Sequence, residues 1–526
     1  MNIFNDLFDG KTVDIDLQKY LNYKGKNAFD FRTHSTNKIS QFLLFKKSGK
    51  FLNFKNKKIH KSFSQNIFSK HNNKKEKLRF PQIFPNENES SKFVYKNGRI
   101  DTLNSNDNKA DLVVYGKIYT SEGNQIVEAF AVKDGKFVYV GDKAGAESFI
   151  DAGKTEVIDY TGKGLVMPTC GNGHAHYSIG IGVPKVGTAV DRETTPEQFL
   201  NEIVPAAVKK ARDTGATSVF GFGWQFLKFE KNMPTRQQLD EICSDIPIYI
   251  ADEEGHKGLV NAGIMAADGK VLKKEIRGGE IVFGEDGTPT GFLKEQAGTY
   301  TRSFLDTDKL FPVAVAKAAL VDIQQKLLSE GYTMYMDGWS NYFYNESYYK
   351  AAQEMDKAGD LHFMAGLSYE LESWMDIEKN LVKSLEVQKY QSEHVKTHWV
   401  KLFMDGTVET GTGFIEPLYT DGHQGIANWN EDEVAYITRK SNEKNLTMHI
   451  HTMGNKAINR VVNAFVNAGK AELRNTLVHV HFVNDSDYKR IAEHNIYVTE
   501  GMLWHHQSDE GQKILPVIQD FAVFDN

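Results

Sequence analysis

Residues 164–177, GLVMPTCGNGHAHY, carry the most informative pattern of the chain. The stretch begins as an apolar strand and ends on His174 and His176, two imidazoles separated by one residue. In an extended segment, residues i and i+2 point to the same side, so both rings are able to reach one metal ion. Because a lone His-x-His pair often occurs by chance, its meaning depends on what ends the later strands.

Later strands also end on reactive side chains. LTMHIH ends on His449 and His451, TLVHVH ends on His479 and His481, and HWVKLFMDG contains Lys401 among apolar neighbours. A buried lysine is costly unless its pKa falls or the amine is chemically modified. Active sites of α/β barrels lie at the carboxyl ends of the strands. The three histidine pairs and the strand lysine together therefore predict one metal site.

Helices and short apolar strands alternate after residue 167, and strands that are apolar on both faces are typical of a parallel sheet covered by helices. Helices are expected at 313–330, 345–358, 455–468 and 485–493, each followed by a strand. This repetition favours an α/β fold of the TIM (β/α)8-barrel type. We count eight or nine strands, including 216–224 and 246–252, so one of them is assigned to an insertion.

The chain divides into three predicted regions. Residues 1–108 form a basic, Asn- and Lys-rich extension that we expect to be largely irregular and disordered. Residues 109–166 form part of a small β-sandwich domain, with Asp134-Gly135 as a hairpin turn. Residues 167–526 form the barrel domain, which we expect to be incomplete at its C-terminus.

Charge is distributed unevenly along the 526 residues. The formal net charge is −6, but residues 1–108 hold 21 Lys+Arg against 10 Asp+Glu. A basic arm of this kind is able to contact nucleic acid, yet no recognition module accompanies it, so we do not expect a nucleic-acid partner. A membrane partner is not expected either, because no window approaches the ~18 apolar residues of a membrane span. Two cysteines favour a reducing compartment, and we expect a cytoplasmic protein.

Several stretches, taken in order, resemble the amidohydrolase superfamily, specifically the YtcJ-like (amidohydrolase 3) branch, which includes enzymes similar to N-substituted formamide deformylases. The resemblance covers about residues 110–510. Its motifs are GLVMPTCGNGHAHY, GFGW at 221–224, EGHKGLVN at 254–261, GEDGTPTGFLKE at 284–295, VKLFMDGTVETGTGFIEPLYTD, HIHTMGNKAINRVV and RNTLVHVHFV.

The resemblance implies roles for individual residues. It places metal ligands at His174, His176, Lys401, His451 and His479, with Lys401 as a carbamate that bridges two metal ions. His451 rather than His449 matches the family's fifth-strand ligand. His256 and His479 are the implied catalytic residues, and Trp224, His256 and Glu295 are the implied substrate-binding residues. The ligand types suit one or two Zn²⁺ ions, with Fe²⁺, Mn²⁺ or Co²⁺ as alternatives.

The resemblance also implies an aspartate after an eighth strand, and residues 501–526 contain no matching strand–Ser-Asp–Pro segment. The expected function is metal-dependent hydrolysis of a carbon–nitrogen bond, outside peptides, in a small amide-type substrate. The alternative is a catalytically inactive, truncated or frameshifted remnant of such an enzyme. The substrate's identity and the oligomeric state, including a homo-oligomer, stay open.

Overall fold

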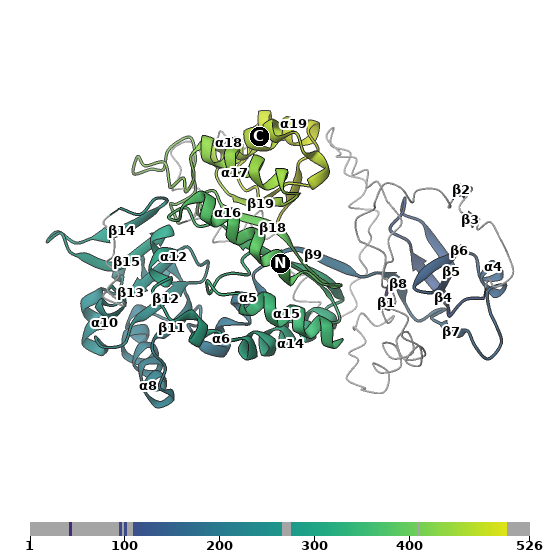
Figure 1. Ribbon diagram of the computed structural model, residues 1–526, viewed down its shortest axis with the longest axis horizontal. Helices are drawn as coiled ribbons and strands as arrows, with labels where there is room; N and C mark the ends of the chain where they lie inside the picture. Colours follow the sequence, from purple (N-terminus) through teal and green to yellow (C-terminus); the bar gives the residue numbers. More distant parts are fainter. Residues whose placement is uncertain are drawn as a thin grey trace. The chain divides into compact units, whose positions relative to one another are not determined.

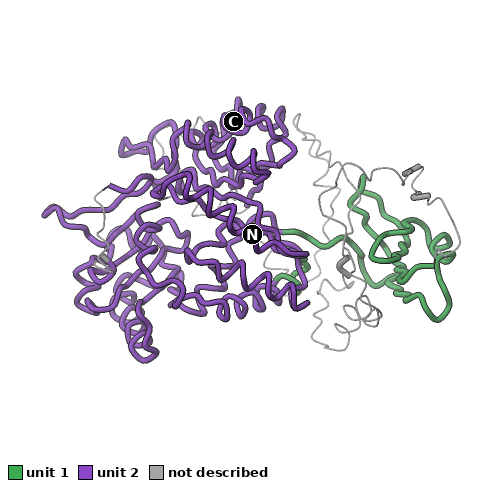
Figure 2. Tube along the Cα trace, in the orientation of Figure 1, with its two compact units in different colours: residues 1–171, 327–333 green, residues 172–326, 334–526 purple. Residues whose placement is uncertain are grey.

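The computed structural model describes residues 42–44, 94–96, 99–101, 109–265, 275–408 and 410–501. Two compact units divide the chain (Figure 2). Unit 1 comprises residues 1–171 and 327–333, and unit 2 comprises residues 172–326 and 334–526. The predicted disorder of residues 1–108 falls almost wholly outside the described residues and stays a prediction.

Unit 1 contains a six-stranded sheet with β4 (Leu112–Tyr119) at its centre. Its other strands are β1 (Phe42–Leu44), β5 (Ile126–Lys133), β6 (Lys136–Gly141), β7 (Glu156–Asp159) and β8 (Leu165–Pro168). β5 and β6 form the predicted hairpin, and Asp134 and Gly135 both have positive φ in its turn. Apolar side chains pack on both faces of this sheet, where they form two separate core clusters.

A second, seven-stranded sheet provides the barrel architecture (Figure 1). Its strands are β9 (Cys170–Ala175), β16 (Tyr332–Asp337), β17 (Met364–Glu370), β18 (Val395–Phe403), β19 (Thr447–Thr452), β20 (Thr476–His479) and β21 (Tyr497–Thr499). Neighbouring strands from β16 to β21 run parallel in sequence order. The predicted α/β fold is thus confirmed.

Helices alternate with these strands, as the sequence predicted. They are α14 (Val313–Ser329), α15 (Ser347–Ala358), α16 (Ile377–Glu386), α17 (Glu431–Glu443), α18 (Asn455–Ala468) and α19 (Asp485–Glu493). α17 and α18 pack their apolar faces against β18 and β19 in one large core cluster. Each buried Val, Ile or Phe side chain in that cluster contributes about 1.5–3 kcal/mol of transfer free energy.

The seven-stranded sheet curls so that its two ends approach each other. β9 and β21 lie at opposite ends of the strand order. A Cβ atom added to Gly173 of β9 would nevertheless lie 3.4 Å from the Cγ2 atom of Thr499 in β21. The described strands therefore form a nearly closed barrel. The prediction that an eighth strand is missing concerns residues that lie mostly outside the described part of the chain.

The sequence assigned one of the counted strands to an insertion, but both 216–224 and 246–252 lie outside the barrel sheet. These residues form β11 (Val219–Trp224) and β12 (Ile248–Asp252), which belong to a separate six-stranded sheet inserted between β9 and β16. Its other strands are β10 (Thr188–Ala189), β13 (Lys257–Val260), β14 (Gly279–Phe283) and β15 (Pro289–Glu295). A strand's apolar pattern reports its burial, whereas the choice of partner strand depends on distant contacts.

Two helices of the insertion show how local sequence sets their geometry. α7 (Pro196–Gln198) begins with a capping box in which the Thr195 side chain accepts from Gln198 N–H. A π-helical turn then spans Phe199–Ile203, and α8 (Val204–Thr214) follows with Pro205 in its first turn. Pro205 lacks a backbone N–H donor, and the π-helical turn lies directly before it in the chain.

No helix among the described residues has both the length and the apolar composition that a membrane span requires.

Candidate metal centre

Five histidine rings meet at the carboxyl ends of β9, β19 and β20, all within unit 2. The ring centroid of His174 lies 4.7 Å from that of His176, 5.0 Å from that of His449 and 5.0 Å from that of His479. The ring centroids of His451 and His479 are 4.8 Å apart. The structure thus brings together all four histidines predicted as metal ligands, and it adds His449 to them.

Strand geometry explains this convergence. His449 and His451 are two residues apart on β19, so they share one face of the strand. Parallel pairing places Lys401 of β18 opposite His449, and Phe403 opposite His451. His479 is the last residue of β20, and its φ of 73° is uncommon for a residue with a side chain. Backbone strain of this kind clusters at functional sites.

Burial keeps the imidazoles neutral. It lowers the pKa of His176 to about 3, and it lowers the pKa values of His174, His449, His451 and His479 well below their usual range. The positive charge of Lys401 lowers these pKa values further. A neutral imidazole is the form that binds a metal ion, so these rings are ready for ligation at neutral pH.

The free nitrogen atoms in this cluster fit a divalent metal ion. The buried atoms His174 Nε2, His176 Nδ1 and Lys401 Nζ make no hydrogen bond. His451 Nε2 lies 3.1 Å from the carbonyl oxygen of Gly406, which holds one nitrogen as donor and leaves Nδ1 as an electron-pair donor. Metal-bound histidines commonly donate their second N–H to a carbonyl in this way.

The nitrogen atoms of the candidate ligands do not point to one common position in this structure. No group of three His, Cys, Asp or Glu side chains within the described ranges is arranged to hold an ion as it stands. His174 Nδ1 lies 2.8 Å from His449 Nε2, so these two rings are hydrogen-bonded to each other. This contact orients the His174 ring and leaves its Nε2 atom without a hydrogen bond.

Lys401 is the residue whose charge acts on all five histidines of the cluster. The side chain is fully buried, and burial lowers the pKa of its ammonium group to about 7, against the opposing effect of Glu370. A large fraction of the amine is therefore uncharged at neutral pH, which is the reactive form of a lysine. This chemistry is compatible with the carbamate that the sequence resemblance implies.

His256 lies beside the cluster and pairs with Glu295. The His256 Nδ1 atom lies 2.8 Å from Glu295 Oε2, and both side chains are buried. The His256 ring centroid is 5.1 Å from that of His451. Burial disfavours both charged forms, but their mutual attraction outweighs it, raising the pKa of His256 and lowering the pKa of Glu295. The pair is therefore ionic.

Trp224 occupies a different environment. Its side chain is fully buried in the core of the inserted sheet, where its ring packs against Phe229 and Phe292. Its indole N–H donates to the carbonyl oxygen of Ile250 at 3.0 Å. The indole ring and its N–H group are thus both engaged by contacts within this core. The assignment of Trp224 to substrate binding thus stays a prediction from resemblance.

Two residues of this region were not predicted as site residues. His449 was recognised as a strand-end histidine but was set aside in favour of His451. Glu370 ends β17 opposite Lys401, is fully buried, and has two carboxylate oxygens without a hydrogen-bond partner. Burial and the neighbouring Glu372 raise its pKa well above the usual value. The carboxylate at the end of the apolar run LHFMAGLSYE was the available sequence signal.

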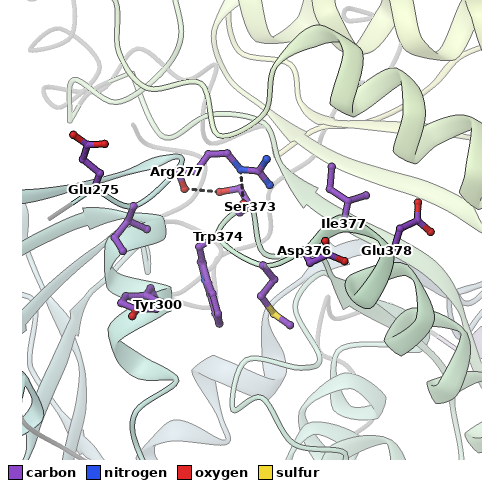
Figure 3. Close-up of a pocket in the computed structure, with 10 residues that line it drawn as sticks. Glu275, Arg277, Tyr300, Ser373, Trp374, Asp376, Ile377 and Glu378 are labelled. Atoms are coloured by element: carbon purple, nitrogen blue, oxygen red, sulfur yellow. Dashed lines mark hydrogen bonds between the residues drawn. The ribbon is translucent and has the colours of Figure 1, made fainter. Parts of the chain in front are cut away.

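A cavity of about 480 Å³ lies beside the loop that follows β17 (Figure 3). It is lined by Tyr300, Trp374 and Arg277 among others, and Figure 3 shows Arg277 bonded to Ser373. Trp374 donates from its indole nitrogen to Thr299 Oγ1 at 3.1 Å. The lining contains none of the candidate metal ligands.

Comparison with known families identifies the class of protein. Residues 156–505 match the Amidohydro_3 model, described as "Amidohydrolase family". This range covers all of the inserted sheet and all seven barrel strands. The chain therefore belongs to the amidohydrolase family, in the branch that its motifs predicted.

Individual relatives are distant. The chain is 26% identical to the exoenzymes regulatory protein AepA of Pectobacterium carotovorum, over 71% of this chain and 76% of that protein. It is 24% identical to YtcJ of Bacillus subtilis (72% and 70% coverage) and to the N-substituted formamide deformylase of Arthrobacter pascens (75% and 75%). An uncharacterized metal-dependent hydrolase from Pyrococcus horikoshii shares the fold, with a TM-score of 0.55, 22% identity and 74% coverage of each chain.

Proposed function

We propose that this protein is a metal-dependent hydrolase that cleaves a carbon–nitrogen bond, outside peptides, in a small amide-type substrate. The observation that carries the proposal is the cluster of buried, neutral histidines around Lys401, with unbonded nitrogen atoms on His174 and His176. Membership of the amidohydrolase family supports hydrolysis, and the deformylase relative supports a non-peptide amide as substrate.

The proposed ligands are His174, His176, Lys401, His451 and His479, with Lys401 as a carbamate. Zn²⁺ is the preferred ion on grounds of ligand type, and Fe²⁺, Mn²⁺ or Co²⁺ suit the same nitrogen and oxygen donors. A divalent ion held by these residues would supply hydroxide at neutral pH and would polarise a carbonyl group.

The protein's own residues perform the remaining tasks. The Gly406 carbonyl fixes the ring of His451, and His449 contacts His174 and restricts its rotation. His256 uses Nδ1 for Glu295, so its Nε2 atom is the one available to bond a substrate oxygen as negative charge develops there. His479, at the strained end of β20, is the second candidate for this contact.

Metal content tests the site directly. Purified wild-type protein is expected to retain close to one or two equivalents of divalent metal by elemental mass spectrometry. The His174→Ala/His176→Ala double variant is expected to lose most of it. His494→Ala, which removes an exposed histidine at the end of α19, is the matched control and should retain the wild-type content.

Substrate class is tested with the metal-loaded protein on a panel of N-formyl and N-acetyl amines beside dipeptides. Release of free amine from the non-peptide amides, and not from the dipeptides, is the expected result. Wild-type protein that binds metal but hydrolyses neither group would favour the inactive alternative. Equal, low metal content in wild type and the double variant would refute the site itself.

A further inference from the structure

Glu295 and His256 are joined by two separate contacts. The carboxylate oxygen Oε2 lies 2.8 Å from His256 Nδ1, and the backbone N–H of Glu295 donates to the carbonyl oxygen of His256 at 2.6 Å. The first contact fixes the imidazole and the second fixes its backbone. We propose that Glu295 is a positioning residue that orients the His256 ring toward the metal centre. This inference rests on the proposed function.

The other neighbours of His256 show where the oriented ring lies. Its centroid is 5.1 Å from that of His451, and the ring meets Phe403 edge to face with 5.4 Å between centroids. The carboxylate accepts hydrogen bonds only, so it requires a proton on Nδ1. Nε2 is then the ring atom left for the substrate, as in other sites where a carboxylate sets the orientation of a histidine.

The backbone of Glu295 has an unusual conformation at the point where its side chain contacts His256. Glu295 ends β15 and precedes α12 (Gln296–Arg302) with φ of 49° and ψ of −129°. A non-glycine residue at such angles persists only where its surroundings over-determine it, and such residues cluster at active sites. A carboxylate needed only for a surface ion pair would have no reason to occupy a strained, buried position.

The absence of a side chain at Gly406 leaves space for the Glu295 carboxylate. A Cβ atom at position 406 would lie 2.1 Å from Glu295 Oε1, closer than any real contact. The carbonyl oxygen of the same glycine lies 3.1 Å from His451 Nε2. One residue of the loop after β18 therefore touches both the proposed metal ligand and the residue that positions His256.

The test combines a spectroscopic readout with kinetics. In protein labelled with ¹⁵N-histidine and loaded with Zn²⁺, the Nδ1–H proton of His256 is expected as a downfield, exchange-protected resonance, assigned with His256→Gln. Glu295→Leu should remove this resonance and lower kcat about 10–100-fold, with metal content unchanged. KM should change little, because orientation acts on the transition state.

Two further variants sharpen the result. Glu295→Gln keeps an acceptor oxygen of the same reach, so it should retain the resonance and restore most of kcat. Glu280→Gln neutralises a half-exposed carboxylate paired with Lys294 on the neighbouring strand, and should match wild type. If Glu295→Leu does not fold, Gly406→Ala replaces it, because the added methyl group would meet Glu295 Oε1 and the Thr412 side chain, and displacing the carboxylate should likewise remove the resonance.

A resonance and a kcat that persist in Glu295→Leu, or in Gly406→Ala where that variant is used, would overturn the proposal while leaving the hydrolase function intact. Failure of the proposed function has a different signature, which is wild-type protein without bound metal or hydrolysis. The Nδ1–H resonance of His256 can still be measured in that case. Its loss in the Leu variant would then support only the contact, and the positioning role would be refuted.

Discussion

Lys401 on β18 lies directly opposite His449 on β19 and opposite Glu370 on β17. All three side chains are buried, and neither Lys401 Nζ nor the Glu370 carboxylate has a hydrogen-bond partner. Three neighbouring strands thus direct an amine, an imidazole and a carboxylate to one level of the barrel.

The stability of the metal-free protein should depend on pH through Lys401. Its pKa is about 7 when folded and 10.5 in an unfolded chain, so between these values the unfolded state binds the extra proton. Unfolding free energy should therefore rise with pH in this window, with a contribution of up to about 1.4 kcal/mol per pH unit. Urea titrations of wild type and Lys401→Met at pH 7, 8 and 9 measure this contribution. A slope unchanged by Lys401→Met would contradict it.

His449 and His451 should differ in their effect on metal binding. His451→Ala removes a proposed ligand and should abolish retention of at least one metal equivalent. His449→Ala removes only the neighbour that restrains His174, and should weaken metal affinity about 10–100-fold. Competition with a coloured chelator measures both affinities. The reverse order would identify His449 as the ligand.

Trp224 should behave as a core residue. Replacing its buried indole by alanine should cost about 3–5 kcal/mol of unfolding free energy. The milder Trp224→Phe variant should be stable enough to assay and should keep the wild-type metal content and KM. Chemical denaturation and steady-state kinetics test the two variants. A large rise in KM for Trp224→Phe would instead support the predicted role in substrate binding.

Asp405 should be essential for the loop that carries Gly406. Its carboxylate accepts hydrogen bonds from the backbone N–H groups of Phe414, Met453 and Gly454. Asp405→Ala leaves these buried donors without a partner, at roughly 1–3 kcal/mol each. Thermal unfolding should therefore show a loss of several kcal/mol. A variant as stable as wild type would mean that other acceptors replace the carboxylate.

The local sequence pattern was sufficient to predict the helices and strands, but it was insufficient to predict which strands pair with each other. The bounds of α18 and α19 agree with the prediction because apolar periodicity and flanking turns are encoded within a few residues. Only one strand was assigned to an insertion, whereas β11 and β12 both lie in the inserted sheet, because their apolar runs look like those of barrel strands. Strand pairing is a long-range property that such runs do not contain.

The candidate site, too, could be predicted from the sequence only in part. His174, His176, His451 and His479 were recognised from strand ends and from the order of motifs, and the structure gathers them. The part played by His449 depends on the register of β18 against β19, and the position of Trp224 depends on the packing of the insertion. Neither property can be obtained from spacing along the chain.

The approach of β9 to β21 has a mechanical consequence. His174 and His479 stand on opposite sides of this seam, about 300 residues apart in sequence, and their ring centroids are 5.0 Å apart. An ion shared by these two side chains would act as a cross-link that closes a very long loop, and its binding energy would add to the stability of the folded state. Hydrogen exchange in β9, β20 and β21 should therefore slow when metal is added, because the candidate metal site would also hold the two ends of the barrel sheet together.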